Sequence, residues 1–114
     1  MNSNEVIHAS ESLPDGRYVA LSGDIDLSRS PVMRHELLQH AERGHPRLVV
    51  DLSGVSYMDS SGVATLVEAL QAQRKHGGRM VLCGLQDRVR SIFEIARLDM
   101  VFTIVETREE AAEA

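Results

Sequence analysis

The residues with the clearest chemical potential are Asp59, Ser60, Ser61 and Gly62, which stand directly ahead of an apolar helical pattern. Asp and Ser are preferred at helix N-termini because their side-chain oxygens accept hydrogen bonds from unpaired backbone N–H groups. The same N–H groups can bind a phosphate oxygen, and Gly62 removes side-chain bulk that would hinder a partner approaching the serines. The segment is therefore either a plain helix cap or a helix start with a modifiable serine, and the residue types leave both open.

A second acidic pair, Asp24 and Asp26, lies in the loop Gly23–Asp26 after a predicted strand. Taken alone, it is a solvated loop in which Asp26 helps to start a helix. If this loop meets the Asp59 loop, its carboxylates would oppose the charge of about −1.5 to −2 that a phosphate adds. The helix start would partly favour that same charge, so we expect the local structure to survive modification.

Short apolar strands and amphipathic helices alternate around these residues. The first strand begins at Val6, a turn carrying Pro14 and Gly16 follows, and the later strands span 17–22, 48–52, 80–83 and 101–105. Three helical faces are predicted, with their apolar residues at Met33/Leu37/Leu38/Ala41, Val63/Leu66/Val67/Leu70 and Val89/Ile92/Phe93/Ala96. Ser30, Asp87 and Thr107 are the predicted caps, the last with Glu110 in a capping box.

This order predicts an α/β fold with a mixed β-sheet of about five strands, packed with about four helices. The opening hairpin makes the sheet mixed. Residues 17–22 alternate in polarity and are predicted to form a half-buried strand. Residues 48–52 are apolar apart from Asp51 and are predicted to form a central strand covered on both faces.

Length and composition restrict the class of protein. The 114 residues fit a single domain, 1–114, and the formal net charge of −5 disfavours nucleic acid and anionic membranes as partners. The lone Cys83 excludes an intramolecular disulfide and is expected in the core. The sequence has neither a signal-peptide pattern nor an apolar run of about 20 residues, which favours a cytoplasmic protein without membrane insertion.

The stretch 49–66, with its Asp59-Ser60-Ser61-Gly62, resembles the STAS domain of the anti-sigma factor antagonists. The resemblance extends over nearly the whole chain and includes Gly23-Asp24-Ile25-Asp26, Gly77-Gly78 and the helix with Ile92-Phe93. It implies a STAS fold in which the serine directly after the motif Asp, here Ser60, is phosphorylated. Ser61 is the second hydroxyl of the pair, and the resemblance singles out Ser60 over it.

The resemblance also implies a partner-switching mechanism in bacterial signalling. The unphosphorylated protein would bind an anti-sigma factor that is also a serine kinase, and so release a sigma factor for transcription. Phosphorylation would end this binding, and a serine phosphatase would restore it. Partner contacts are then expected at Asp26, Asp59, Ser61, Gly62 and Asp24, with Asp24 standing where the family more often has Glu.

Catalytic and cofactor chemistry is not predicted. A G-x-S-x-G elbow, an H-E-x-x-H pattern and a phosphate-binding glycine loop are all absent, so we expect no enzyme, cofactor or metal. A response-regulator receiver is disfavoured because Glu106 and Thr107, rather than Lys, follow the last strand. The alternative within the same fold is a non-catalytic STAS subunit of an ABC-type lipid transporter or a stress-signalling assembly.

Overall fold

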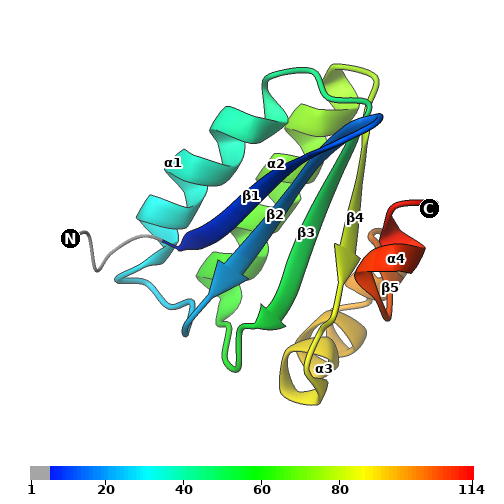
Figure 1. The fold of residues 1–114 in the computed structure, drawn as a ribbon. Helices are drawn as coiled ribbons and strands as arrows, with labels where there is room; N and C mark the ends of the chain where they lie inside the picture. The colour runs from blue at the N-terminus through cyan, green and yellow to red at the C-terminus, as the bar shows by residue number, and fades with distance from the viewer. Residues whose placement is uncertain (1–5) are drawn as a thin grey trace.

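The computed structural model describes residues 6–114, which form one mixed β-sheet with helices on both faces (Figure 1). In this part of the chain five strands follow one another across the sheet in sequence order: β1 (Ile7–Leu13), β2 (Gly16–Ser22), β3 (Arg47–Gly54), β4 (Arg79–Cys83) and β5 (Thr103–Val105). β1 is antiparallel to β2, and the later neighbours are parallel. The predicted hairpin and mixed sheet are confirmed.

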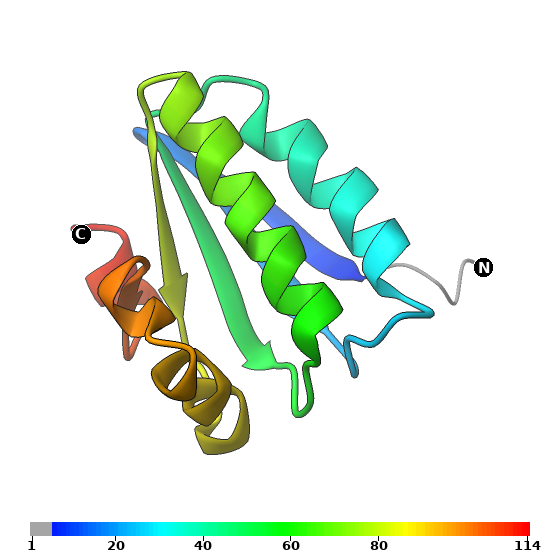
Figure 2. The ribbon, with the colours of Figure 1, turned by 180° about the vertical axis from the view of Figure 1, so that it is seen from behind.

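Residues 6–114 also contain four α-helices and one short 3₁₀ helix: α1 (Ser30–Ala41), α2 (Ser60–Lys75), α3 (Asp87–Ile95), η1 (Leu98–Met100) and α4 (Arg108–Ala111). Figure 2 shows α1 and α2 lying alongside each other across one face of the sheet, with α3 toward one end. α4 lies on the opposite face, which is turned toward the viewer in Figure 1. The sequence reasoning predicted the four α-helices but did not predict η1.

The core has two parts because successive strand residues point to opposite faces. Val19, Leu21 and Val50 point toward α1, α2 and α3, where the larger core cluster lies. Phe93 of α3 completes this side with an edge-to-face contact to Phe102, their ring centroids 5.4 Å apart. The smaller cluster faces α4 and consists of Tyr18, Ala20, Val49, Val81 and Cys83. The Cys83 thiol is buried, as predicted.

The half-buried character predicted for β2 is wrong. Tyr18 and Ala20 are each only 6% exposed, and Val19 and Leu21 are fully buried. The second face of the strand is covered because α4, which is distant in the sequence, packs over it. A local alternation of polarity therefore did not reveal that both faces are covered.

Two of the three predicted caps are also wrong. Ser30 is the first residue of α1, and the N–H of Ser30 donates to the Asp26 carbonyl oxygen at 2.8 Å. Asp87 is the first residue of α3, where its charge still suits the positive end of the helix. Thr107 and Glu110 do form the predicted capping box, in which the Glu110 N–H donates to Thr107 Oγ1 at 3.1 Å.

Candidate functional site

Asp59 caps the N-terminus of α2 with both its side chain and its backbone. Its Oδ1 accepts hydrogen bonds from the Ser61 N–H at 2.9 Å and the Ser61 hydroxyl at 2.5 Å. Its carbonyl oxygen accepts from the N–H groups of Gly62 and Val63. The hydrogen bond from the Ser61 hydroxyl is the main reason why the pKa of Asp59 is lowered, so this cap carries a negative charge at neutral pH.

This arrangement corrects one expectation in part, since within residues 6–114 only the N–H of Ser60 itself is left without a partner at the start of α2. The sequence reasoning expected backbone N–H groups at the start of α2 to be free for a phosphate oxygen. The N–H groups of Ser61, Gly62 and Val63 are instead all bonded to Asp59. Asp59 thus occupies these donors itself, and a phosphate on this turn would meet a charged carboxylate.

The two serines of the motif differ in their surroundings. Ser60 is the first residue of α2 and is exposed, and its hydroxyl makes no hydrogen bond within residues 6–114. Ser61 is half-buried, and its hydroxyl is held by Asp59. The Ser61 carbonyl oxygen also accepts from Thr65 Oγ1 at 3.0 Å. Ser60 is therefore the more accessible nucleophile, and Ser61 is part of the cap.

The Asp24–Asp26 loop and the Asp59 loop do meet. Between them, the Ile25 N–H donates to the Tyr57 carbonyl at 2.9 Å, and the Asp59 N–H donates to the Ile25 carbonyl at 3.0 Å. These two bonds form an isolated parallel bridge between Ile25 and Met58. The bridge continues the parallel pairing of β2 and β3 beyond the ends of both strands, so the loop of Asp24 and Asp26 shares one surface with the distant Ser60.

The carboxylates of this surface are held by serines. Asp24 is exposed and accepts a hydrogen bond from Ser56 Oγ at 3.0 Å. Asp26 accepts from the Ser28 hydroxyl at 2.6 Å, and this bond is the main cause of its lowered pKa. The negative charge of Asp26 in turn acts to raise the pKa of Asp59, since the two carboxylates lie within electrostatic reach. The site is thus a cluster of negative charge around an exposed hydroxyl.

Gly62 has a structural role that the sequence reasoning did not foresee. It is buried, and a Cβ built on it would lie 2.7 Å from both Ile25 Cγ2 and Met58 Cγ. The missing side chain lets α2 pack against the bridge between the loops, rather than opening the serines to a partner. Contact of Gly62 with a partner remains a prediction.

Three further residues belong to this surface and were missed. Arg29 Nη1 donates to the carbonyl oxygens of Ser22 and Asp24 at 3.0 and 2.7 Å, which fixes the loop that carries Asp24. Leu27 and Tyr57 are large apolar side chains that are 77% and 42% exposed, one in each of the bridged loops. Single exposed apolar residues in loops are common, so Leu27 and Tyr57 can be read as parts of one surface only once the bridge between their loops is known.

The described residues contain neither a group of metal-ligating side chains nor a membrane-spanning helix. Within residues 6–114, no three His, Cys, Asp or Glu side chains lie close enough together to hold a metal ion. None of the described helices is long and apolar enough to cross a bilayer.

Comparison with known proteins places this geometry in a family. The STAS domain model matches residues 9–111. BtrV of Bordetella bronchiseptica, a protein assigned to the anti-sigma factor antagonists, is 32% identical over 101 residues, covering 88% of this chain and 87% of BtrV. The anti-sigma-B factor antagonist of Bacillus subtilis is 36% identical over 86 residues, covering 75% and 78%.

Solved structures share the same fold. The anti-sigma factor antagonist SpoIIAA in its unphosphorylated form superposes with a TM-score of 0.76 at 21% identity, covering 92% of each chain. The phosphorylated form of SpoIIAA, a Bacillus cell fate determinant, superposes with a TM-score of 0.69 at 21% identity, covering 92% of this chain and 96% of SpoIIAA. The sequence matches and the shared fold together show that this chain belongs to the STAS domain family.

Proposed function

We propose that this chain is an anti-sigma factor antagonist whose 114 residues form a single, cytoplasmic STAS domain. Its unmodified form binds an anti-sigma factor that is also a serine kinase, and this binding releases a sigma factor. The observation that carries the proposal is the exposed Ser60 hydroxyl at the start of α2, beside a charged cap that engages Ser61 instead. The names of the curated relatives support the same role.

Phosphorylation of Ser60 is the proposed switch. Ser60 Oγ attacks the γ-phosphorus of ATP bound to the kinase, so that a new O–P bond forms as the bond to the ADP leaving oxygen breaks. The hydroxyl proton passes to a base of the kinase or to water. The chain is then a binding protein and a substrate rather than an enzyme, and a serine phosphatase resets it by hydrolysis.

The charge around Ser60 explains why the modified form would release its partner. A phosphate adds about −1.5 to −2 charges to a surface that already carries Asp24, Asp26 and Asp59. A partner that binds closely over the unmodified Ser60 hydroxyl would lose its fit, because the phosphate adds both bulk and charge at that point. The new charge needs no rearrangement of α2, because Asp59 continues to cap the helix.

The deciding experiment is affinity capture from the source cells with wild type, Ser60→Ala, Ser60→Asp and the matched control Ser61→Ala, followed by mass spectrometry. We expect wild type and Ser60→Ala to capture one ATP-binding anti-sigma factor, and Ser60→Asp to lose it while remaining folded. Phosphate should appear on wild type and on Ser61→Ala, and be absent from Ser60→Ala.

Two results would contradict the proposal. Equal capture of the kinase by Ser60→Asp and wild type would exclude the switch. A stable ATPase partner without any phosphate on Ser60 would instead support a non-catalytic subunit of a transporter or stress-signalling assembly.

A further inference from the structure

The face of the sheet opposite α1, α2 and α3 carries a second buried strip. It consists of Tyr18, Ala20, Val49, Val81 and Cys83, which lie in two adjacent rows across β2, β3 and β4. Within residues 6–114, α4 and the residues that follow it are what covers this strip, and Figure 1 looks directly onto this side. We call residues 106–114 the α4 arm.

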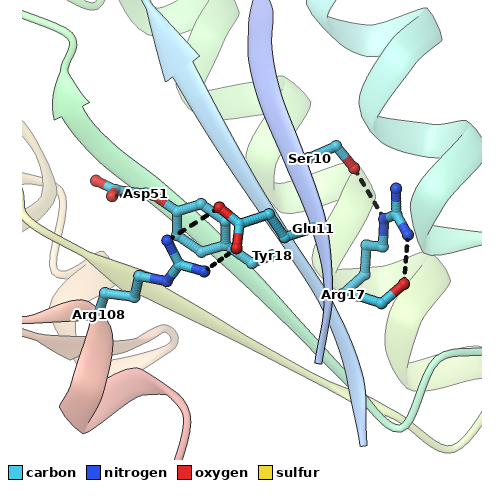
Figure 3. Close-up of polar contacts among 7 residues, drawn as sticks. Ser10, Glu11, Arg17, Tyr18, Asp51 and Arg108 are labelled. Atoms are coloured by element: carbon cyan, nitrogen blue, oxygen red, sulfur yellow. Dashed lines mark hydrogen bonds and ion pairs between the residues drawn. The ribbon is translucent and has the colours of Figure 1, made fainter. Parts of the chain in front are cut away.

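The arm is held mainly by polar contacts at the rim of the strip. Arg108 donates to both carboxylate oxygens of Glu11 at 2.6 and 3.2 Å, and its guanidinium carbon lies 3.7 Å from the centre of the Tyr18 ring (Figure 3). The Tyr18 hydroxyl donates to Asp51 Oδ2 at 2.5 Å. In α4 itself, Ala111 is the buried apolar residue.

The far end of the arm is held in a similar way. The Ala114 carbonyl oxygen accepts from Arg47 Nε at 3.0 Å, from Arg47 Nη2 at 2.8 Å and from Arg79 Nη1 at 3.1 Å. The arm therefore touches β1, β3 and β4 through the charged side chains of Glu11, Arg47 and Arg79 and β2 through the Tyr18 ring, and it adds little apolar area of its own. All of these receiving groups are present on the sheet of every copy of the chain.

The arm is also poorly suited to exist as an independent helix. α4 spans four residues, about one turn, and helices of that length do not persist in water without tertiary contacts. Glu106 and Thr107 connect it to β5, and both residues are exposed. Such a segment is expected to open locally while the rest of the sheet stays folded.

We propose that the α4 arm is exchangeable, and that the strip beneath it is an interaction surface for the arm of a second copy of this chain. Exchange keeps each contact of Arg108, Ala111 and Ala114 and changes only the chain that supplies them. The exchanged form is therefore favoured by concentration rather than by new contacts.

Cys83 reports the opening of the arm. The thiol is 1% exposed, and burial raises its pKa to about 12, so both shielding and protonation protect it from a thiol reagent while the arm is closed. It is the one cysteine in the sequence, so modification can be followed without further engineering.

The test combines sedimentation from micromolar to millimolar concentration with the rate of Cys83 modification by a thiol reagent. For wild type we expect a dimer that grows with concentration and returns slowly to monomer on dilution. Arg108→Ala should speed both Cys83 modification and dimer–monomer exchange by about three- to tenfold, because it removes one half-exposed ion pair and one cation–π contact. The dimer fraction at equilibrium should be unchanged, since both forms lose the same contacts.

Arg34→Ala is the matched control. It removes the ion pair between Arg34 and Glu68, which is about as exposed as the Arg108–Glu11 pair and lies on the other side of the sheet. It should change neither rate. A chain that stays monomeric at millimolar concentration overturns the proposal. So does a dimer whose equilibrium constant falls in Arg108→Ala, which would indicate an ordinary surface contact, or Cys83 modification that occurs only at the rate of global unfolding.

Discussion

The two faces of the sheet are covered in different ways. On one side, α1, α2 and α3 bury large side chains such as Leu37, Leu66 and Phe93 against the strands. On the other side, α4 buries Ala111 and is otherwise held by Arg108, Arg47 and Arg79. Burial of apolar area dominates stability, so the first side contributes most to holding the fold together, while opening the second exposes only the smaller strip under α4. Ser60 lies on the first, more stable side, at the start of α2.

The largest expected effect is the loss of a core side chain on the helix-covered side. Leu66 of α2 is fully buried, and Leu66→Ala should cost about 2–5 kcal/mol of unfolding free energy, measured by urea denaturation. Leu27→Ala is the control, because Leu27 is 77% exposed and its truncation should change stability little. A cost below about 1 kcal/mol for Leu66→Ala would contradict the comparison of the two faces.

A smaller effect is expected where a polar contact supports the α4 side. Tyr18→Phe removes the hydrogen bond to Asp51, and a bond to a charged group contributes about 1.5–3 kcal/mol. Burial acts to raise the pKa of Asp51, but its hydrogen bonds from Tyr18 and Ser53 lower it. The variant should therefore also shift the Asp51 pKa upward, which NMR titration of the carboxyl carbon would detect. Tyr57→Phe, at an exposed tyrosine, is the control and should change neither the free energy of unfolding nor the pKa of Asp51.

Ion pairs should matter less on both sides. Arg108→Ala and Arg34→Ala each remove one exposed ion pair, and such pairs contribute little to stability because water and salt screen them. Arg108→Ala should destabilise the chain more than Arg34→Ala because Arg108 also stacks on Tyr18. Urea midpoints at low and high salt would show this, since the ion-pair contribution weakens with salt. If Arg34→Ala lowered the free energy of unfolding as much as Leu66→Ala, ion pairs would stabilise the fold as strongly as the apolar core, and the proposed difference would be wrong.

The smallest expected effect is that the two sides of the sheet lose stability in different pH ranges. Burial, followed by the nearby charges of Arg43 and Arg17, lowers the pKa of His40 and of His45 at the end of the helix-covered side. Stability from neutral imidazoles is complete above the unfolded pKa of 6.5 and declines as the pH falls below it, because the unfolded chain then binds more protons.

The α4 side should respond only at lower pH. The pKa of Asp51 is lowered from 3.8, so its contribution is present above that value and is lost as the pH falls through the folded pKa. Urea midpoints of wild type and a His40→Gln/His45→Gln double variant between pH 7.5 and 3 would separate the two windows. The double variant should lose the first decline and keep the second. An unchanged first decline would show that these histidines are not its source.

Much of the fold followed from local patterns, whereas the site depended on contacts between distant segments. Periodicity identified the strands and α1, α2 and α3, because each carries an apolar face of its own, and the capping-box spacing of Thr107 and Glu110 indicated α4. The bridge between Ile25 and Met58 left no such pattern, and it determines both the position of Asp26 and the need for Gly62. The cap at Ser30 was predicted wrongly for a local reason, because the Asp26 carbonyl oxygen, four residues upstream, already accepts a hydrogen bond from the Ser30 N–H.

The strand order has a consequence for how the protein is made. Since β1, β2, β3, β4 and β5 are neighbours in the sheet in the same order as in the chain, each new strand adds to an existing edge and none has to insert between two others. The sheet can therefore grow outward while the ribosome is still synthesising the chain, with α1 and α2 closing one side early. The strip under α4 stays uncovered until α4 itself has been synthesised, so nascent copies on one messenger RNA present it to one another.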